Sequence, residues 1–153
     1  MSSYPNLPTD EGPKRKWIVV SLLLLLILVA GVYVFSRRGE GLANMSAAEA
    51  HLAIGPGTAE PVQEIERSTN PEVYYHIVLH GAPMGWSLEL HCEWLDPAGS
   101  VARNNVYETR FIYKSTWPTH CRQAFSSEAA AGPWQVRLLS GERVVSSTPF
   151  VLK

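Results

Sequence analysis

Two histidine–cysteine pairs are the residues of this chain whose types most readily suggest chemistry. Cys92 follows His91 in the stretch LELHCEWLD, and Cys121 follows His120 in THCRQ. These two cysteines are the only ones among the 153 residues. They could form a disulfide, remain as buried thiols, or serve a metal or redox site. The chain has no CxxC motif, the arrangement that thiol-exchange chemistry uses.

The stretch around Cys92 has the alternating pattern of a β-strand. In WSLELHCEW, residues 86–94, every second residue is apolar, and Cys92 falls on the apolar face. Neighbouring side chains in a strand point to opposite faces, so His91 and Cys92 are poorly placed to bind one metal ion. An oxidising compartment would favour a Cys92–Cys121 disulfide. Closing a loop of about 30 residues would stabilise the fold by roughly 3–4 kcal/mol in the chain-entropy model.

A second candidate for metal binding lies on the polar face of the same strand. Residues 73–80, VYYHIVLH, also alternate, and GAPMG joins them to the strand at 86–94. A hairpin that keeps both apolar faces on one side places His76 opposite His91, with Glu89 nearby. Two imidazoles and a carboxylate can bind zinc or copper. The alternative is that these are ordinary histidines on a solvated sheet face.

The sequence lacks the motifs of common enzymes. It contains no GxSxG, HExxH or SxxK motif and no phosphate-binding glycine loop. His120 beside Cys121 resembles a catalytic pair only in composition, because catalytic dyads are assembled across space. We therefore expect a non-catalytic protein without a cofactor.

A long apolar segment precedes these residues. Trp17–Phe35 contains no charge, and Ser21 is its only aliphatic hydroxyl. Its 19 residues would span about 28 Å as a helix, close to the thickness of a bilayer core. Basic residues flank the segment on both sides, at Lys14–Lys16 and Arg37–Arg38. We predict a transmembrane helix over residues 17–36; a cleaved signal peptide is the competing interpretation.

The flanking charges predict the orientation of that helix. Three basic residues precede it and two follow, which places the N-terminus in the cytoplasm. We expect a disordered cytoplasmic tail at residues 1–16, a linker at 37–60, and an extracytoplasmic domain at 61–153 in the periplasm or outside the cell. From Gly39 onward, eight basic and twelve acidic residues give a formal net charge of −4. Without a basic stripe, nucleic acid is not an expected partner.

The sequence predicts an all-β domain at residues 61–153. Alternating stretches recur with turn signals between them, as in Asp96-Pro97-Ala98-Gly99, and a helical period is missing. We predict about seven strands in an antiparallel β-sandwich.

The end of the chain resembles a known class of domain. It reads Gly132-x-Trp134-x-Val136-x-Leu138, a turn at Gly141, and Phe150-x-Leu152. This pattern resembles the last hairpin of immunoglobulin-like domains in bacterial membrane-anchored envelope proteins. The resemblance covers roughly residues 60–153. It implies an immunoglobulin-like sandwich behind one membrane helix, and because several such families are uncharacterised it implies no functional residue.

Trp117 does not fit the alternation of the neighbouring strands. It precedes Pro118, close to His120 and Arg122. Tryptophan is enriched at binding hot spots, so Trp117, His120 and Arg122 are candidates for an interface; covering the edge of the sandwich is an equal alternative for Trp117. We therefore predict an envelope interaction or assembly module that contacts membrane lipid through its helix and an envelope protein through its domain. The alternative function is a metal- or small-ligand-binding envelope protein.

Overall fold

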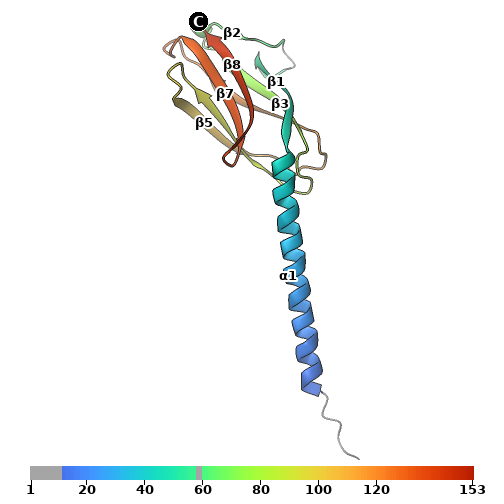
Figure 1. Cartoon of the computed structure of the whole chain (residues 1–153). Helices are drawn as coiled ribbons and strands as arrows, with labels where there is room; N and C mark the ends of the chain where they lie inside the picture. The colour runs from blue at the N-terminus through green and yellow to red at the C-terminus, as the bar shows by residue number, and fades with distance from the viewer. Residues whose placement is uncertain (1–11, 58–59) are drawn as a thin grey trace, which may run out of the picture. The chain divides into compact units, whose positions relative to one another are not determined.

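The structure is a computed structural model that describes residues 12–57 and 60–153 (Figure 1). The chain divides into two compact units, Met1–Gly39 and Glu40–Lys153. The first contains most of a long helix, and the second is a β-domain. The two units are described separately.

The predicted apolar helix is present. α1 comprises Gly12–Asn44, and its segment Lys16–Ser36 is 21 residues long with a mean hydropathy of 3.0. That segment is long and apolar enough to cross a membrane, although a signal sequence near an N-terminus would meet the same criteria. Pro13 lies in the first turn, where a missing N–H breaks no helical hydrogen bond. The tail predicted at 1–16 falls outside the described residues up to position 11, and from Gly12 onward it is helical.

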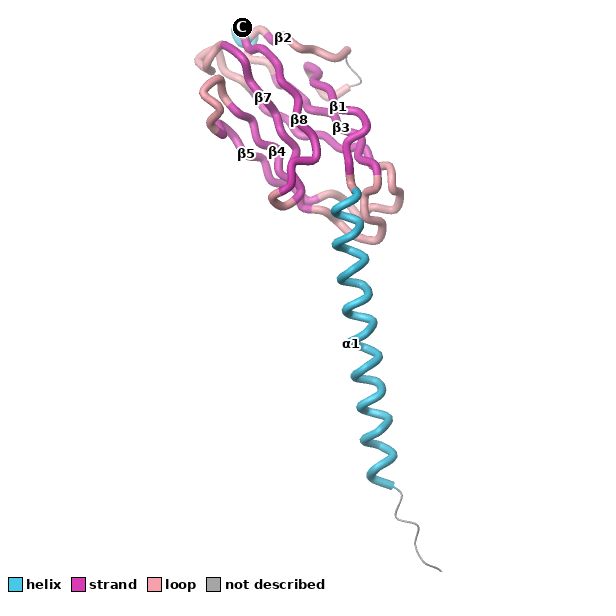
Figure 2. The backbone as a smooth tube through the Cα atoms, in the orientation of Figure 1, coloured by secondary structure: helices cyan, strands magenta, loops and turns pink. Residues whose placement is uncertain are grey.

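Over the described residues, the β-domain consists of two sheets with eight strands. Figure 2 shows how these strands are arranged. The three-stranded sheet has the order β1-β3-β6, and the five-stranded sheet has the order β2-β8-β7-β4-β5. Neighbouring strands are antiparallel except for the short β2, which runs parallel to β8. The strands are β1 Ser46–Ile54, β2 Glu64–Ile65, β3 Glu72–His80, β4 Glu89–Leu95, β5 Val101–Glu108, β6 Trp117–Ala124, β7 Gly132–Ser140 and β8 Arg143–Leu152, with a short 3₁₀ helix at Arg67–Thr69.

The predicted linker at 37–60 was wrong over much of its length. α1 continues to Asn44, and β1 occupies Ser46–Ile54, where it pairs with β3 from His80 back to Val73. The sequence SAAEAHLAI is poor in residues with high β-propensity, and a β-bulge between Ala47 and Glu49 interrupts its alternation. Pairing with β3 and burial of Leu52 and Ala53 impose a strand that local sequence does not favour.

The predicted hairpin between residues 73–80 and 86–94 was also wrong. β3 pairs with β1 and β6, whereas β4 pairs with β5 and β7 in the other sheet. The connecting segment crosses between the sheets, and its backbone bonds to a distant loop: Ala82 N–H to Ser115 O and Gly85 N–H to Ile112 O, at 3.0 and 2.8 Å. The alternation correctly identified the inward face of each strand, but two inward faces can meet across a sandwich as well as within one sheet.

The core lies between the two sheets and is rich in aromatic rings. Trp94 and Phe150 are buried and pack edge to face, with ring centroids 6.1 Å apart. Trp134 and Leu152 are buried as the alternation predicted, and Gly141 lies at the β7–β8 turn with a φ of 59°. Trp86, which was also expected in the core, is 37% exposed because it lies in the crossing segment before β4.

A disulfide joins the two sheets. Cys92 on β4 and Cys121 on β6 are bonded, with their Cα atoms 6.4 Å apart. Of the alternatives that the sequence left open for the two cysteines, the structure contains the disulfide. It therefore connects an inner strand of one sheet to the end strand of the other.

Removing this cross-link should lower the stability of the domain. The double variant Cys92→Ala with Cys121→Ala should lose about 3–4 kcal/mol of unfolding free energy, because the unfolded chain regains the freedom that the cross-link removes. Urea unfolding of the full-length protein in detergent, followed by tryptophan fluorescence, measures this. A reductant should destabilise the native protein similarly and leave the double variant unchanged. An equal unfolding midpoint for the native and variant proteins would contradict the expectation.

Candidate functional site: a groove between two sheet edges

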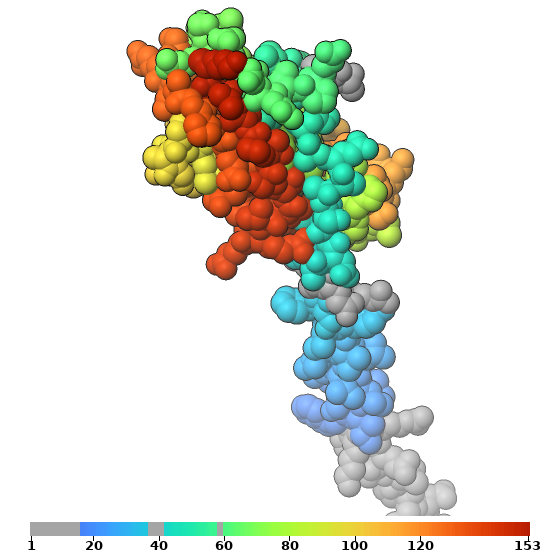
Figure 3. Space-filling model, turned by 45° about the horizontal axis from the view of Figure 1, so that its top comes forward, coloured from blue at the N-terminus to red at the C-terminus, as the bar shows by residue number. Residues whose placement is uncertain are grey.

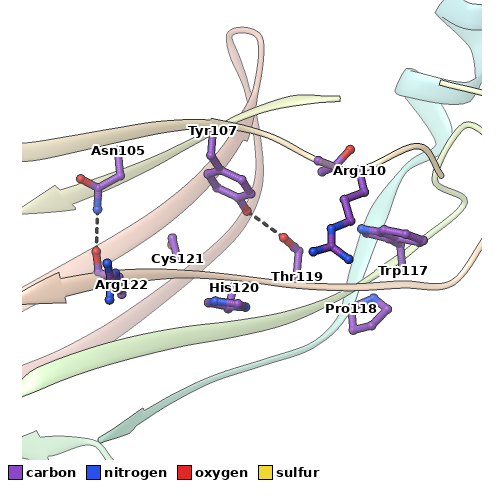
Figure 4. Close-up of a pocket in the computed structure, with 10 residues that line it drawn as sticks. Asn105, Tyr107, Arg110, Trp117, Pro118, Thr119, His120, Cys121 and Arg122 are labelled. Atoms are coloured by element: carbon purple, nitrogen blue, oxygen red, sulfur yellow. Dashed lines mark hydrogen bonds between the residues drawn. The ribbon is translucent and has the colours of Figure 1, made fainter. Parts of the chain in front are cut away.

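A groove of about 620 Å³ lies between the end strands of the two sheets (Figure 4). β5 ends the five-stranded sheet and β6 ends the three-stranded sheet. On another side of the domain, β1 and β8 lie beside each other (Figure 3). The residues that line the groove are Asn105, Tyr107, Thr109, Arg110, Trp117, Pro118, Thr119, His120, Cys121 and Arg122.

The three interface candidates predicted from sequence all line this groove, from β6. They do not share one face of the strand, because Trp117 has the same parity as the inward Cys121, whereas His120 and Arg122 point outward. Trp117 is half-buried and packs edge to face against Tyr113, with ring centroids 5.4 Å apart. The disulfide between Cys121 and Cys92 fixes the position of β6 relative to β4, and β6 forms one side of the groove.

The opposite wall contains residues that sequence reasoning did not select. Asn105 donates a hydrogen bond from Nδ2 to the carbonyl oxygen of Arg122, at 2.7 Å, and the hydroxyls of Tyr107 and Thr119 lie 3.0 Å apart (Figure 4). Burial raises the pKa of Tyr107, partly offset by the hydrogen bond with Thr119, so the phenol keeps its proton at neutral pH. These two bridges hold the edge strands together across the groove.

Part of the backbone edge of β6 faces the groove. The Arg122 carbonyl accepts from Asn105 on β5 and therefore points away from β3. In an antiparallel strand, alternate residues direct their N–H and C=O groups to the same side, so Pro118 and His120 present theirs to this edge too. Proline lacks an N–H, and at an edge position this breaks no bond of the β3–β6 ladder.

The groove carries positive charge. Its lining includes Arg110 and Arg122 and, among the described residues, no carboxylate. Arg122 Nη1 pairs with Glu72 Oε1 at 3.0 Å, but both side chains are largely exposed, and such ion pairs contribute little to stability. The Arg110 side chain extends toward β6 between Thr119 and Trp117 (Figure 4). The groove thus offers aromatic surface, an edge backbone and a cation for a ligand.

The residues predicted to form a metal site are not brought together. His76 lies on β3, whereas His91 and Glu89 lie on β4 in the other sheet, where His91 Nε2 is 3.1 Å from Glu89 Oε1. The prediction failed because it relied on the hairpin register. Within the described ranges, no group of three or more His, Cys, Asp or Glu side chains is arranged to hold a metal ion.

His76 instead forms the centre of a row of three histidines on the three-stranded sheet. It pairs directly with His51 of β1 and with His120 of β6, with ring centroids 5.3 and 5.9 Å away. Tyr74, two residues along β3, also stacks against it. Burial lowers the pKa of His76, and the charges that His51 and His120 carry when protonated lower it further.

Comparisons with known proteins identify a fold but not an activity. No protein-family model matches the chain, and no curated protein sequence matches it. An immunoglobulin-like protein from Pseudomonas aeruginosa superimposes with a TM-score of 0.54 at 12% identity, over 73% of this chain and 98% of that one. The alkylpurine DNA glycosylase AlkC of Pseudomonas fluorescens, at 12% identity, covers 78% of this chain and 35% of its own, but its TM-score of 0.47 is too low to support an argument. The β-domain is therefore an immunoglobulin-like sandwich, with one sheet that is mixed.

The histidine row should make the stability of the domain depend on pH. His76 has a lowered pKa in the folded protein and an ordinary value of about 6.5 when unfolded. As the pH falls below about 6.5, the unfolded chain takes up this proton first, so stability is lost until the pH reaches the folded pKa. Above about pH 6.5, His76 is neutral in both the folded and the unfolded chain, and its contribution to the unfolding free energy is fully present.

Urea unfolding between pH 5 and 8 tests this expectation. His76→Gln should show a weaker loss of stability on acidification than the native protein. His91→Gln, in the other sheet, is the control and should keep the native dependence. Identical pH profiles for native protein and His76→Gln would mean that His76 does not contribute to the pH dependence.

Proposed function

We propose that the protein is a single-pass, membrane-anchored and non-catalytic interaction module of the cell envelope. The observation that supports this most strongly is the groove between β5 and β6, because it combines two sheet edges with the interface candidates Trp117, His120 and Arg122. On this proposal the protein contacts membrane lipid through α1 and an envelope protein through the groove.

The proposed topology has the N-terminus in the cytoplasm and the β-domain in the periplasm or outside the cell. The excess of basic residues before the apolar segment supports that orientation. The Cys92–Cys121 disulfide supports it independently, because such bonds persist in oxidising compartments and are rare in the cytosol. An uncleaved helix then anchors the domain at the cytoplasmic membrane.

The partner that the groove suits best is an extended peptide segment. Edge strands bind such segments by adding them to the sheet, with main-chain hydrogen bonds for affinity and side-chain pockets for specificity. The main chain of His120 and the N–H of Arg122 would bond to the segment, because the Arg122 carbonyl already accepts from Asn105. Trp117 with Tyr113 would contact an apolar side chain. Arg110 would pair with a carboxylate, so we expect an acidic residue in the bound segment.

Site-specific photo-crosslinking in the native membrane tests this function. A benzoylphenylalanine replacing Pro118, which lines the groove and is exposed, should capture one envelope protein in stoichiometric amount. The same probe replacing Glu142, in the exposed β7–β8 turn, is the matched control and should not capture it. Equal capture at both positions, or recovery of abundant bystanders only, would contradict the proposal.

Substitutions in the groove should weaken the same complex. With the photo-probe at Pro118, Trp117→Ala should reduce capture by about tenfold or more, since truncating a tryptophan anchor typically costs 2 kcal/mol or more. Arg110→Glu should also reduce capture by reversing the charge, and Arg110→Lys should reduce it less. Unfolding curves verify that each variant is folded. Undiminished capture by folded Trp117→Ala and Arg110→Glu proteins would exclude the groove as the binding site.

A further inference from the structure

We propose that a ribbon at one end of the β-domain, residues 82–88 and 109–115, lies in the headgroup layer of the membrane. Met84, Trp86 and Phe111 would contact lipid there. None of these three side chains lines the groove. The inference rests on one part of the proposed function, the anchoring of the protein in the membrane by α1.

The ribbon is an ordered part of the domain. Its two segments run antiparallel and are joined by backbone hydrogen bonds. Ala82 N–H donates to Ser115 O at 3.0 Å, and Ile112 N–H donates to Trp86 O at 2.9 Å. The side chains of Ala82, Leu88 and Ile112 are buried and fasten the ribbon to the core. The remaining side chains are therefore presented from a fixed backbone.

The ribbon begins at the end of the domain that receives the chain from α1. Ser46, the first residue of β1, pairs with His80, the last residue of β3, and the ribbon follows directly after β3. Gly81 lies against the last residue of α1, because a Cβ atom added to it would be 2.9 Å from the carbonyl oxygen of Asn44. The ribbon and the entry point of the chain are therefore neighbours.

The connection between that entry point and the apolar segment is short. The apolar segment ends at Ser36, and the eight residues 37–44 lead from it to Met45, which belongs to the domain core. Eight residues rise about 12 Å as a helix and reach at most about 30 Å when fully extended. The headgroup layer is itself about 5–8 Å thick. An anchored α1 thus holds this end of the domain close to the bilayer surface.

The exposed side chains of the ribbon suit the headgroup layer. Met84 is 61% exposed and Phe111 is 63% exposed, and Trp86 between them in the sequence is 37% exposed. Grouped exposed apolar side chains mark sites of protein or membrane contact. Tryptophan is enriched where a membrane meets water. The short connection to α1 favours the bilayer over a soluble partner.

The charge of the ribbon differs in sign from that of the domain. The ribbon contains Arg110 and Lys114 and no acidic residue, whereas residues 39–153 have a formal net charge of −4. The nearest acidic residues in the sequence, Glu89 and Glu108, belong to β4 and β5. Arg110 lines the groove, so we assign Lys114 to the lipid phosphates. Basic residues near a membrane surface are attracted by anionic lipids.

Spin labels on the full-length protein, in nanodiscs of phosphatidylcholine and phosphatidylglycerol, test the contact. The native cysteines are held in the disulfide, so a nitroxide reacts with an introduced cysteine. Labels at Met84→Cys and Phe111→Cys should be more accessible to oxygen, which concentrates in lipid, than to a water-soluble nickel chelate. The matched control is Ala98→Cys, in the exposed turn at the other end of β4, where nickel should have the better access. The same aqueous preference at all three positions would overturn the proposal.

A label inside the apolar segment separates this inference from the anchoring on which it rests. Leu24→Cys should report a lipid environment. Lipid at Leu24 together with water at Met84 and Phe111 would refute the ribbon contact alone. Water at Leu24 would refute the anchoring and the ribbon contact together.

Charge reversal tests the role of Lys114. With the label at Met84, Lys114→Glu should lower the ratio of docked to free ribbon, read from the two components of the spectrum, by about fivefold or more in nanodiscs that contain phosphatidylglycerol. In nanodiscs of phosphatidylcholine alone the change should be smaller, and Lys114→Arg should keep the native ratio in both. Unfolding curves verify that each variant is folded. An unchanged ratio for folded Lys114→Glu would overturn the assignment of Lys114 to lipid phosphates.

Discussion

The Cys92–Cys121 disulfide is the constraint on which the arrangement of the β-domain most depends. β6 is the end strand of its sheet, and within that sheet it pairs only with β3. The covalent link to β4 ties β6 to the interior of the opposite sheet, close to Trp94 at the centre of the aromatic core. The separation between the sheets at this edge, and with it the width of the groove, is therefore set by a bond and not by packing alone.

Much of the inward face of the domain could be predicted from sequence, because burial between two sheets imposes a period of two. Leu90, Cys92 and Trp94 on β4 and Phe150 and Leu152 on β8 are buried as the alternation indicates. Strand pairing could not be predicted in the same way. Each apolar face is compatible with any other apolar face, and the turn residues at 81–85 do not distinguish a hairpin from a crossing between sheets.

In the candidate sites too, residues that stand out within one strand could be predicted, whereas residues whose role depends on a second strand could not. Trp117 could be selected from sequence because it broke the local alternation beside a proline. Asn105 and Tyr107 could not, since their role comes from reaching across to the edge of another sheet. His51 was likewise missed, because it lies on β1, whose alanine-rich sequence and bulge conceal a strand.

Pro118 has a consequence for how copies of this protein meet one another. Exposed end strands tend to pair with identical strands and so promote aggregation. A partner strand aligned along β6 finds no N–H at Pro118, and this gap remains in every register that covers the position. When two copies of β6 pair antiparallel, each copy contributes one Pro118, so two inter-strand hydrogen bonds are missing. A strand of another sequence loses one hydrogen bond, and it can place its own proline or its end opposite Pro118. The missing N–H of Pro118 thus disfavours the pairing of one β6 edge with another.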